Sequence, residues 1–339
     1  MAKADELLVE TIEGIFADHC APEMVGAAEG GIDAKLWGLL EEGGLSTVGL
    51  SEANGGSGGT LHDAAAIVKA AGRYAAPAPI AEKALVGGWA LEQAGLNVPA
   101  GALAVVVCEQ GFSGVVRHVP WAGAAENLVL VSPEGVAVAP ASFARLEPGV
   151  NHAGEPWAHV TLDGLALTPS PGPSPADVWA RGALSRALLM AGALGQAVDL
   201  SVQYANEREQ FGRPIGKFQI MQHYLAEIAG EAAAAEAAAD TAVDVAALAA
   251  EPGDARLAIA AAKSTAGRAA GIICRISHQI HGAIGFTDEH RLQYSTRRLW
   301  SWRDEYGGDG AWAAELGTAL CAAGGAALWP LLTTWPPAS

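Results

Sequence analysis

Residues 204 to 219, which read YANEREQFGRPIGKFQ, gather a guanidinium, an amide and an aromatic ring within a few positions. Arg208 offers a planar fork of donors, Gln210 an amide and Phe211 a flat apolar face. A guanidinium matches phosphate oxygens, and backbone N–H groups at a helix start point toward anions. The segment is therefore suited to holding a phosphate beside an aromatic ring system. The alternative is a helix-capping turn with a solvated arginine, because glycine and proline commonly punctuate helix ends.

A second segment, QIHGAIGFTDE at 279 to 289, closes an apolar helical stretch with polar groups and glycines. Gln279 and His281 stand at the end of the helix, and Gly282 and Gly285 permit a sharp turn or a close approach of the backbone to a ligand. Together the two segments predict a pair of helix-end corners that could act on one ligand.

The two segments resemble the carboxy-terminal helical domain of the acyl-CoA dehydrogenase family of flavoenzymes. The resemblance is carried by an EREQFG-x-PI-x-x-FQ block and, about sixty residues later, by Q-x-HG-x-x-GFT. Further family-like words are LWGLLEEGGLSTVGLSEANGGSGG at 36 to 59, AAGRYAAPAPIAE at 70 to 82 and ALLMAGALGQAVDLSVQYA at 187 to 205. The resemblance covers most of the chain and is weakest over 100 to 175.

The resemblance implies an FAD-dependent α,β-dehydrogenation of an acyl-CoA thioester, in which a carboxylate removes the α-proton and the flavin accepts the β-hydride. It places Arg208 and Gln210 at the FAD pyrophosphate and Phe211 and Ile215 beside the adenosine. The rest of that pocket would comprise Gln219, Gln279, Ile280 and Gly282. Ala283 stands where the family usually has a second glycine, which adds a methyl group to a tight backbone approach.

The general base is where the chain departs from the family pattern. Counting from Gly285, the family's glutamate in a Y-E-G word falls on Tyr306, with Glu305 just before it. The other family position for the base, just ahead of Arg186 on the first bundle helix, is Ser185. A one-residue shift makes Glu305 the candidate base, and the alternative is a solvated acid pair at a helix end. Arg186 is the candidate substrate residue.

The resemblance also implies an oligomer, a homo- or hetero-oligomeric dimer or tetramer with an electron-acceptor flavoprotein as a partner. The β domain lacks the family's T-E-P-x-x-G-S-D loop, since the match stops after residues 108 to 111. Shortened family members of this kind include subunits of α2β2 enzymes that act on bulky acyl-CoAs. A non-catalytic subunit that supplies part of the FAD site is therefore the alternative to a complete dehydrogenase, and a helical protein that has lost FAD is a third reading.

Charge and composition exclude several classes of protein. The chain has 339 residues, 51% of them hydrophobic, and 37 acidic against 20 basic residues give a net charge of −17. This excess repels nucleic acid and anionic membranes, so neither is an expected partner. A polyanionic ligand would need locally gathered cations, for which the candidates are Arg186, Arg208, Arg213 and Lys217.

Four widely separated cysteines without a C-x-x-C pair, and histidines without an H-x-x-x-H spacing, give no indication of a metal site or a disulfide framework. The amino terminus lacks a basic flank followed by an apolar core, and the alanine-rich runs are broken by acidic residues. A cytoplasmic location is expected.

The periodicity predicts a mainly α, α+β fold, and the resemblance implies that it is of the acyl-CoA dehydrogenase type, with a reduced β domain. Helices at 3–18, 33–44, 60–75 and 79–95 form an N-terminal domain over 1–98, and strands at 102–108, 127–132 and 136–140 form a small β domain over 99–168. A proline-rich linker follows at 169–175. Helices at about 176–208, 216–250, 254–282 and 309–327 predict a four-helix bundle over 176–330.

Overall fold

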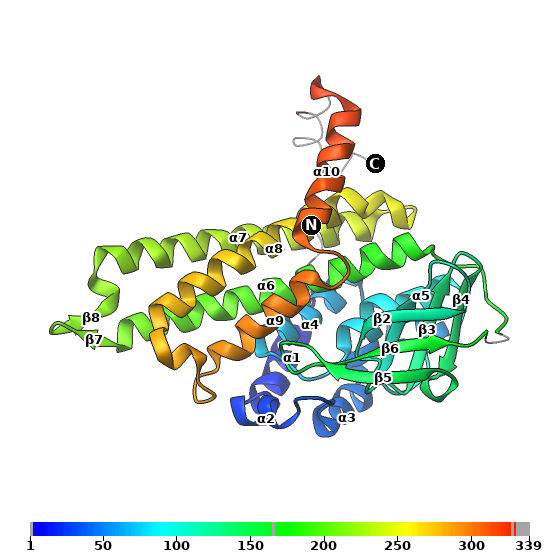
Figure 1. The fold of residues 1–339 in the computed structure, drawn as a ribbon, viewed down its shortest axis with the longest axis horizontal. Helices are drawn as coiled ribbons and strands as arrows, with labels where there is room; N and C mark the ends of the chain where they lie inside the picture. The colour runs from blue at the N-terminus through cyan, green and yellow to red at the C-terminus, as the bar shows by residue number, and fades with distance from the viewer. Residues whose placement is uncertain (1–2, 165–166, 327–328, 330–339) are drawn as a thin grey trace.

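The computed structural model describes residues 3–164, 167–326 and 329. Its N-terminal domain is a small helical unit (Figure 1). Its helices are α1 (Glu6–His19), α2 (Pro22–Ala27), α3 (Ala34–Glu42), α4 (Leu61–Tyr74), the π-helix η3 (Glu82–Gly87) and α5 (Gly88–Gln93). The start of α4 is fixed by a capping box, in which the Thr60 hydroxyl and the Asp63 carboxylate each accept the other's backbone N–H. The four helices expected here are present, and α2 is additional.

The middle domain consists of two three-stranded sheets. One has the order β1 (Leu103–Val107), β3 (Asn127–Ser132) and β4 (Gly135–Pro140), with β1 and β3 parallel. The other has the order β2 (Gly114–Pro120), β6 (Pro156–Leu162) and β5 (Arg145–Val150), all antiparallel. The three predicted strands form the first sheet, because continuous apolar runs are easy to recognise. The second sheet was missed, since β2 and β5 are largely exposed and carry glycine and proline.

The C-terminal domain is a four-helix bundle, as predicted, but its fourth helix is a different one. Helices α6 (Pro175–Glu207), α7 (Gln219–Leu248) and α8 (Arg256–His281) agree with the predicted stretches. The bundle is completed by α9 (Leu292–Asp304), which packs against α6 and α8 and was not predicted. The predicted helix over 309–327 corresponds to α10 (Asp309–Ala323), which projects away from the bundle (Figure 1) and buries only Trp312 among its described residues.

Small residues let helix α6 approach the N-terminal domain closely. A Cβ atom added to Gly192 would lie 1.9 Å from the Lys69 carbonyl oxygen on α4, and one added to Gly72 would lie 2.0 Å from the Leu189 carbonyl oxygen. The backbones of α4 and α6 therefore lie in direct contact, which requires glycine at both positions.

The stretch Pro252–Phe286 is long and apolar enough to cross a membrane by length and composition alone, and 61% of its most apolar window is buried inside the fold. That burial is what the central helix of a bundle requires, since α8 contacts α6, α7, α9 and α10.

Candidate cofactor and active site

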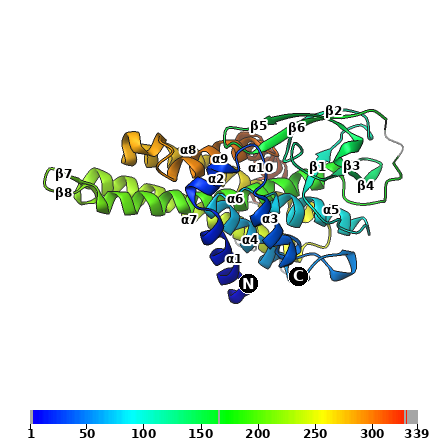
Figure 2. The ribbon, with the colours of Figure 1, turned by 90° about the horizontal axis from the view of Figure 1, so that it is seen from below.

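The predicted segment around Arg208 and Phe211, which we call the arginine-and-phenylalanine corner, is a β-hairpin that projects beyond the end of the bundle. Strands β7 (Glu209–Gln210) and β8 (Arg213–Pro214) pair across the two residues Phe211 and Gly212, whose φ angles are +54° and +77°. Positive φ at both central residues is the geometry of a type I′ turn, which phenylalanine rarely adopts. Figures 1 and 2 both place this hairpin at the far end of the molecule. Phe211 is 91% exposed at the tip of the hairpin, and its ring meets Phe218 edge-on with ring centroids 6.1 Å apart.

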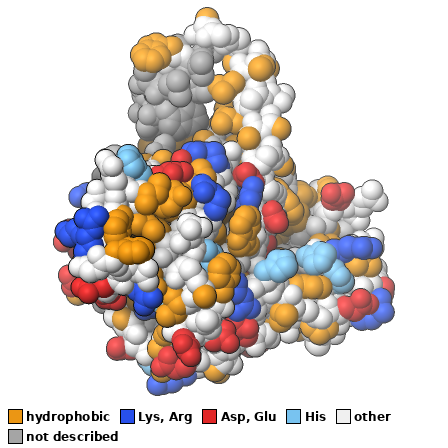
Figure 3. All heavy atoms as spheres, turned by 60° about the vertical axis from the view of Figure 1, so that its left-hand side comes forward, with side chains coloured by type: hydrophobic (Ala, Val, Ile, Leu, Met, Phe, Trp, Pro, Cys, Tyr) orange, Lys and Arg blue, Asp and Glu red, His pale blue; other side chains and the backbone are white. Residues whose placement is uncertain are grey.

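Four polar side chains at this end of the bundle have donors available for a ligand or a second subunit. Arg208, Gln210, Gln219 and Gln279 are exposed, and their side chains make no hydrogen bond or ion pair with any residue that the structure describes. Figure 3 turns this end forward and shows hydrophobic, basic and acidic side chains interspersed on its surface. A cation–π contact stabilises the hairpin, because the Arg213 guanidinium lies 4.3 Å from the centroid of the Phe218 ring at the start of α7.

The second predicted segment, residues 279–289, which we call the glycine corner, lies at the same end of the bundle. Helix α8 ends at His281, and Gly282 follows with a φ of +62° before a 3₁₀ turn over Gly282–Phe286. The His281 ring stacks on Tyr204, four residues before Arg208, with ring centroids 4.6 Å apart. The two predicted corners are thus joined at one site.

Three further residues were predicted to contact FAD. The backbone of Gly282 is open to a ligand, whereas the side chains of Ile215 and Ile280 are buried in the bundle. A Cβ atom added to Gly282 would meet nothing within 4 Å, so its backbone faces open space. Ala283 is exposed inside the 3₁₀ turn and is not among the residues with positive φ, so its methyl group fits the local conformation. Ile215 and Ile280 are 7% and 4% exposed and pack in the bundle core. Their contact with adenosine stays a prediction.

Three histidines support the glycine corner, and burial lowers the pKa of each. His281 is 3% exposed, its Nδ1 bonds to the Ser277 carbonyl oxygen at 2.8 Å, and its Nε2 is buried with no partner among the described residues. The His290 ring lies 4.7 Å from it, and His278 stacks on Phe286 at 4.0 Å. Burial lowers the pKa of His281 from 6.5 to about 4, so the folded protein holds this imidazole neutral.

This histidine makes the fold sensitive to acid. The unfolded chain takes up a proton on His281 below about pH 6.5 while the folded protein does not, so stability present above that pH is lost as the pH falls toward 4. We expect His281 to account for about 2 kcal/mol of lost unfolding free energy between pH 7.5 and pH 5. Urea unfolding of the wild type and of His281→Phe at both pH values measures this, because the other titrating groups are common to both. Equal pH dependence in the two proteins would contradict the assignment.

The two residues predicted near the substrate, Arg186 and Glu305, contact each other. Arg186 is 1% exposed on α6, and its Nε donates to Glu305 Oε2 at 2.5 Å. Its Nη2 donates to the buried carboxylate of Glu82, and its guanidinium faces the Tyr306 ring at 5.0 Å. One cation therefore pairs with two carboxylates, one of them from the π-helix of the N-terminal domain.

Glu305 connects this cluster to the β domain. Its Oε1 accepts a hydrogen bond of 3.3 Å from the Asn151 amide, which also donates to Glu155 at 3.2 Å. Burial raises the pKa of Glu305 above its usual value, while the Arg186 charge opposes the rise. A raised pKa suits a general base, but the Arg186 contact occupies one carboxylate oxygen. The catalytic role of Glu305 and the substrate role of Arg186 stay predictions.

Lys263 positions the turn that carries Glu305, and sequence reasoning missed it. Its side chain is fully buried, and Nζ donates to the carbonyl oxygens of Trp302, Arg303 and Gly307 at 3.1, 2.6 and 2.9 Å. These bonds cap the end of α9, where Tyr306 and Gly307 both have positive φ. The sequence signal that could have revealed it is a lysine among the apolar residues that form the buried face of α8. Burial lowers the pKa of Lys263 to about 7.

The architecture consists of a helical domain, a small β domain and a four-helix bundle that carries the two corners at one end. The model of the acyl-CoA dehydrogenase C-terminal domain matches residues 179–303. Acyl-CoA dehydrogenase IpdE2 of Mycolicibacterium smegmatis is 30% identical over 317 residues, which cover 88% of this chain and 93% of that protein. IpdE2 of Mycobacterium tuberculosis is 32% identical over 314 residues, with 86% and 90% coverage. The chain belongs to the acyl-CoA dehydrogenase family.

The fold agrees with this assignment. The ChsE4–ChsE5 complex of Mycobacterium tuberculosis contains a chain that matches with a TM-score of 0.82 and 20% identity, covering 95% of this chain and 98% of that one. FAD is the cofactor of the family. The unpaired Arg208, Gln210, Gln219 and Gln279 side chains, and the open backbone at Gly282, fit the phosphate and adenosine end of such a nucleotide.

Proposed function

We propose that this chain forms part of an FAD-dependent acyl-CoA dehydrogenase that introduces an α,β double bond into an acyl-CoA thioester. The observation that supports this best is the joining of the two corners by the Tyr204–His281 stack, beside four unpaired donor side chains. The bundle end would bind the adenosine diphosphate portion of FAD, with Arg208 on the pyrophosphate and Phe211 against the adenosine. An oligomer completes the site, because the hairpin projects away from the chain's own β domain.

The chain's own residues would remove the α-proton of the substrate and orient the cofactor. FAD, when bound, supplies hydride acceptance at the β-carbon. Glu305 would accept the α-proton on Oε1, the carboxylate oxygen that only the weak Asn151 bond contacts. The raised pKa of Glu305 strengthens it as a base toward this weak acid, and Lys263 fixes the turn from which it acts.

A second function is favoured by the Arg186–Glu305 contact and by Ser185 at the other family position. In that case the chain is a non-catalytic subunit that supplies half of an FAD site to a catalytic partner. An electron-acceptor flavoprotein would reoxidise the enzyme, and a cytoplasmic location is part of the proposal.

The two functions differ in what the isolated chain can do. We expect the protein purified from its own cells to be yellow and to carry FAD. Bleaching of that colour by acyl-CoA in the isolated chain supports the complete enzyme, whereas bleaching that requires a co-purified partner supports the non-catalytic subunit. A colourless protein that takes up no FAD with or without a partner contradicts both.

Replacement of Arg208 by alanine tests the phosphate contact. A charge-assisted bond to phosphate contributes about 1.5–3 kcal/mol, so Arg208→Ala should weaken FAD binding about tenfold or more. The measurement is the flavin-to-protein ratio after dialysis, followed by FAD titration. Arg268→Ala is the matched control, because that arginine is 56% exposed on α8 and pairs with Glu231. Full flavin content in the Arg208 variant would rule out the contact.

A further inference from the structure

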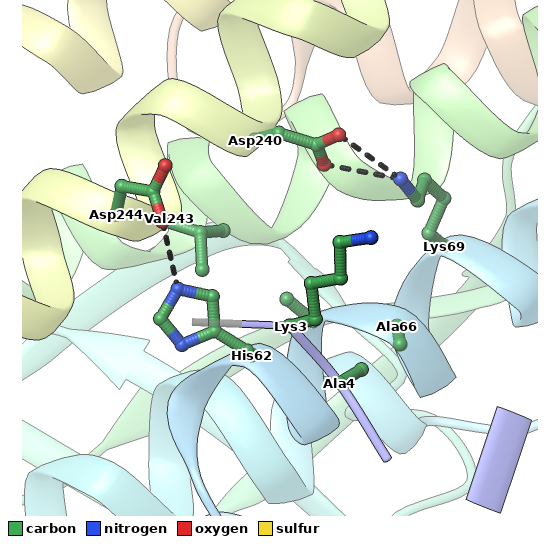
Figure 4. A pocket seen from close by; sticks show the side chains of 9 residues that line it. Lys3, Ala4, His62, Ala66, Lys69, Asp240, Val243 and Asp244 are labelled. Atoms are coloured by element: carbon green, nitrogen blue, oxygen red, sulfur yellow. Dashed lines mark hydrogen bonds and ion pairs between the residues drawn. The ribbon is translucent and has the colours of Figure 1, made fainter. Parts of the chain in front are cut away.

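The cavities of the described residues that lie away from the proposed FAD site include two beside helix α7. The first, of about 300 Å³ between α4 and α7, is shown in Figure 4. Its charged groups largely satisfy each other: His62 pairs with Asp244 at 2.9 Å, and Lys69 pairs with Asp240 at 3.0 Å. Such paired charges tie the two helices together, so this cavity carries little binding capacity for a charged ligand.

The second cavity, of about 160 Å³, is different because its unpaired cation is held inside the fold, whereas Lys3 of the first cavity is exposed. It lies between α5, the start of α6 and the α7–α8 connection, and its lining includes Trp89, Gln93, Arg181, Ala246 and Ile259. The Arg181 Nε donates to the Leu85 carbonyl oxygen at 3.0 Å, and its guanidinium carbon lies 5.0 Å from the Trp89 ring centroid. Its Nη1 and Nη2 atoms make no hydrogen bond or ion pair with any residue that the structure describes.

The geometry of Arg181 is fixed before any ligand arrives. Leu85, which holds its Nε, lies in the π-helix Glu82–Gly87, a distortion that often accompanies function. With one edge of the guanidinium bonded and one face on Trp89, only the Nη1–Nη2 edge is left to bind. Burial without a close counter-charge lowers the pKa of Arg181 to about 10, with Glu92 opposing the shift.

The two acidic residues that line the cavity are committed to helix caps. The Asp177 carboxylate accepts the Ser174 backbone N–H at 3.0 Å and the Ser174 hydroxyl at 2.6 Å. Glu251 accepts a backbone N–H in the capping box with Asp254. Within the described part of the chain neither carboxylate forms an ion pair with Arg181, although Asp177 lies one helical turn before it. The guanidinium is thus kept available beside a wall of alanines and Ile259.

We propose that this cavity binds the carboxylate of a short aliphatic acid. A planar carboxylate matches the Nη1–Nη2 edge in a two-bond arrangement, and the Gln93 amide offers a further donor. The short chain would pack against Ala246 and Ile259. A phosphate dianion fits worse, because one arginine cannot balance two charges beside Asp177 and Glu251. The volume is below the roughly 300 Å³ at which sites for drug-sized ligands begin, so it excludes CoA and FAD.

This site is separate from the proposed FAD site. Arg181 lies near the start of the 33-residue helix α6, whereas Arg208 caps its other end. Arg181 shares a helix face with Ser185, one turn further along and next to Arg186. Arg181 and Arg186 both contact the π-helix, Arg181 through Leu85 and Arg186 through Glu82.

Isothermal titration of the purified flavin-containing protein with propionate and with butyrate tests the proposal. We expect an affinity of about a millimolar, because the ligand has few atoms and one strong contact. Arg181→Met should weaken binding at least about tenfold by removing the charge-assisted pair. Ala246→Leu should weaken it as much by filling the cavity while keeping Arg181. Arg268→Met, an exposed arginine of α8, should leave binding unchanged.

Inorganic phosphate and chloride at matched ionic strength are the competing probes, and neither should displace butyrate. The proposal is overturned if neither acid binds at about ten millimolar, if phosphate binds as tightly as butyrate, or if binding survives Ala246→Leu. Should Arg181→Met fail to fold, Ala246→Leu alone decides. Loss of FAD in the Arg208 variant tests the proposed function and leaves this outcome unaffected.

Discussion

Replacing Arg186 by methionine lowers the unfolding free energy by about 3–5 kcal/mol, the largest stability effect that we expect for a single change in this protein. The substitution leaves two carboxylates without their common cation, and Glu82 is only 1% exposed. A buried unpaired carboxylate must take up a proton or open the structure to water. Urea unfolding followed by circular dichroism measures the loss.

A second variant separates lost charge balance from lost packing. Adding Glu82→Gln and Glu305→Gln to Arg186→Met removes both uncompensated charges, and we expect it to recover part of the loss. Arg268→Met, whose exposed pair with Glu231 contributes at most about 1 kcal/mol, is the surface control. If Arg186→Met and Arg268→Met cost the same, the buried ion cluster contributes no more than a surface pair.

Glu305→Gln lowers turnover of acyl-CoA at least about hundredfold if Glu305 is the general base. The amide keeps the shape of the side chain and its contact with Asn151, so FAD content and acyl-CoA binding should be retained. Wild-type turnover should rise with pH through the raised pKa of Glu305, and the variant should lack that step. Rapid-mixing measurement of flavin reduction, with substrate binding measured separately, distinguishes chemistry from affinity.

Asp304→Asn is the matched control, because Asp304 is the exposed preceding residue in the same turn. It should keep both turnover and flavin. Undiminished turnover in Glu305→Gln would rule out the base role and leave Glu305 as a contact between the bundle and the β domain.

The helices and the order of the domains could be predicted because their signals are local. Capping residues, high helix propensity and apolar runs lie within a few positions of each other in α4, α6 and β3. Helix α9 was missed because LQYSTRRLWSWRD mixes charged, polar and aromatic residues, and its burial comes from partners elsewhere. Residues such as Arg298, 2% exposed beside Glu155, look like surface residues until the tertiary structure pairs them.

The candidate site also contains residues that a local motif reveals and residues that only the tertiary structure brings together. The hairpin residues Arg208 to Phe211 form a contiguous motif, so the sequence indicates them directly. The contacts of Arg186 join positions 104 and 119 residues apart, and no spacing rule reveals such pairs. The cation of the cluster and one acid were both singled out, but their mutual contact was not predicted. Glu82 and Asn151 were not predicted as site residues at all.

The ion cluster has a consequence for how this protein can be divided. Arg186 and Arg298 lie inside the segment 179–303 that the family model matches, yet their carboxylate partners Glu82 and Glu155 lie outside it. A recombinant fragment limited to that segment would expose two arginines that evolved for neutralisation by the rest of the chain. We expect such a fragment to be less stable than the same segment in the whole chain, because it keeps two buried cations and loses their anions.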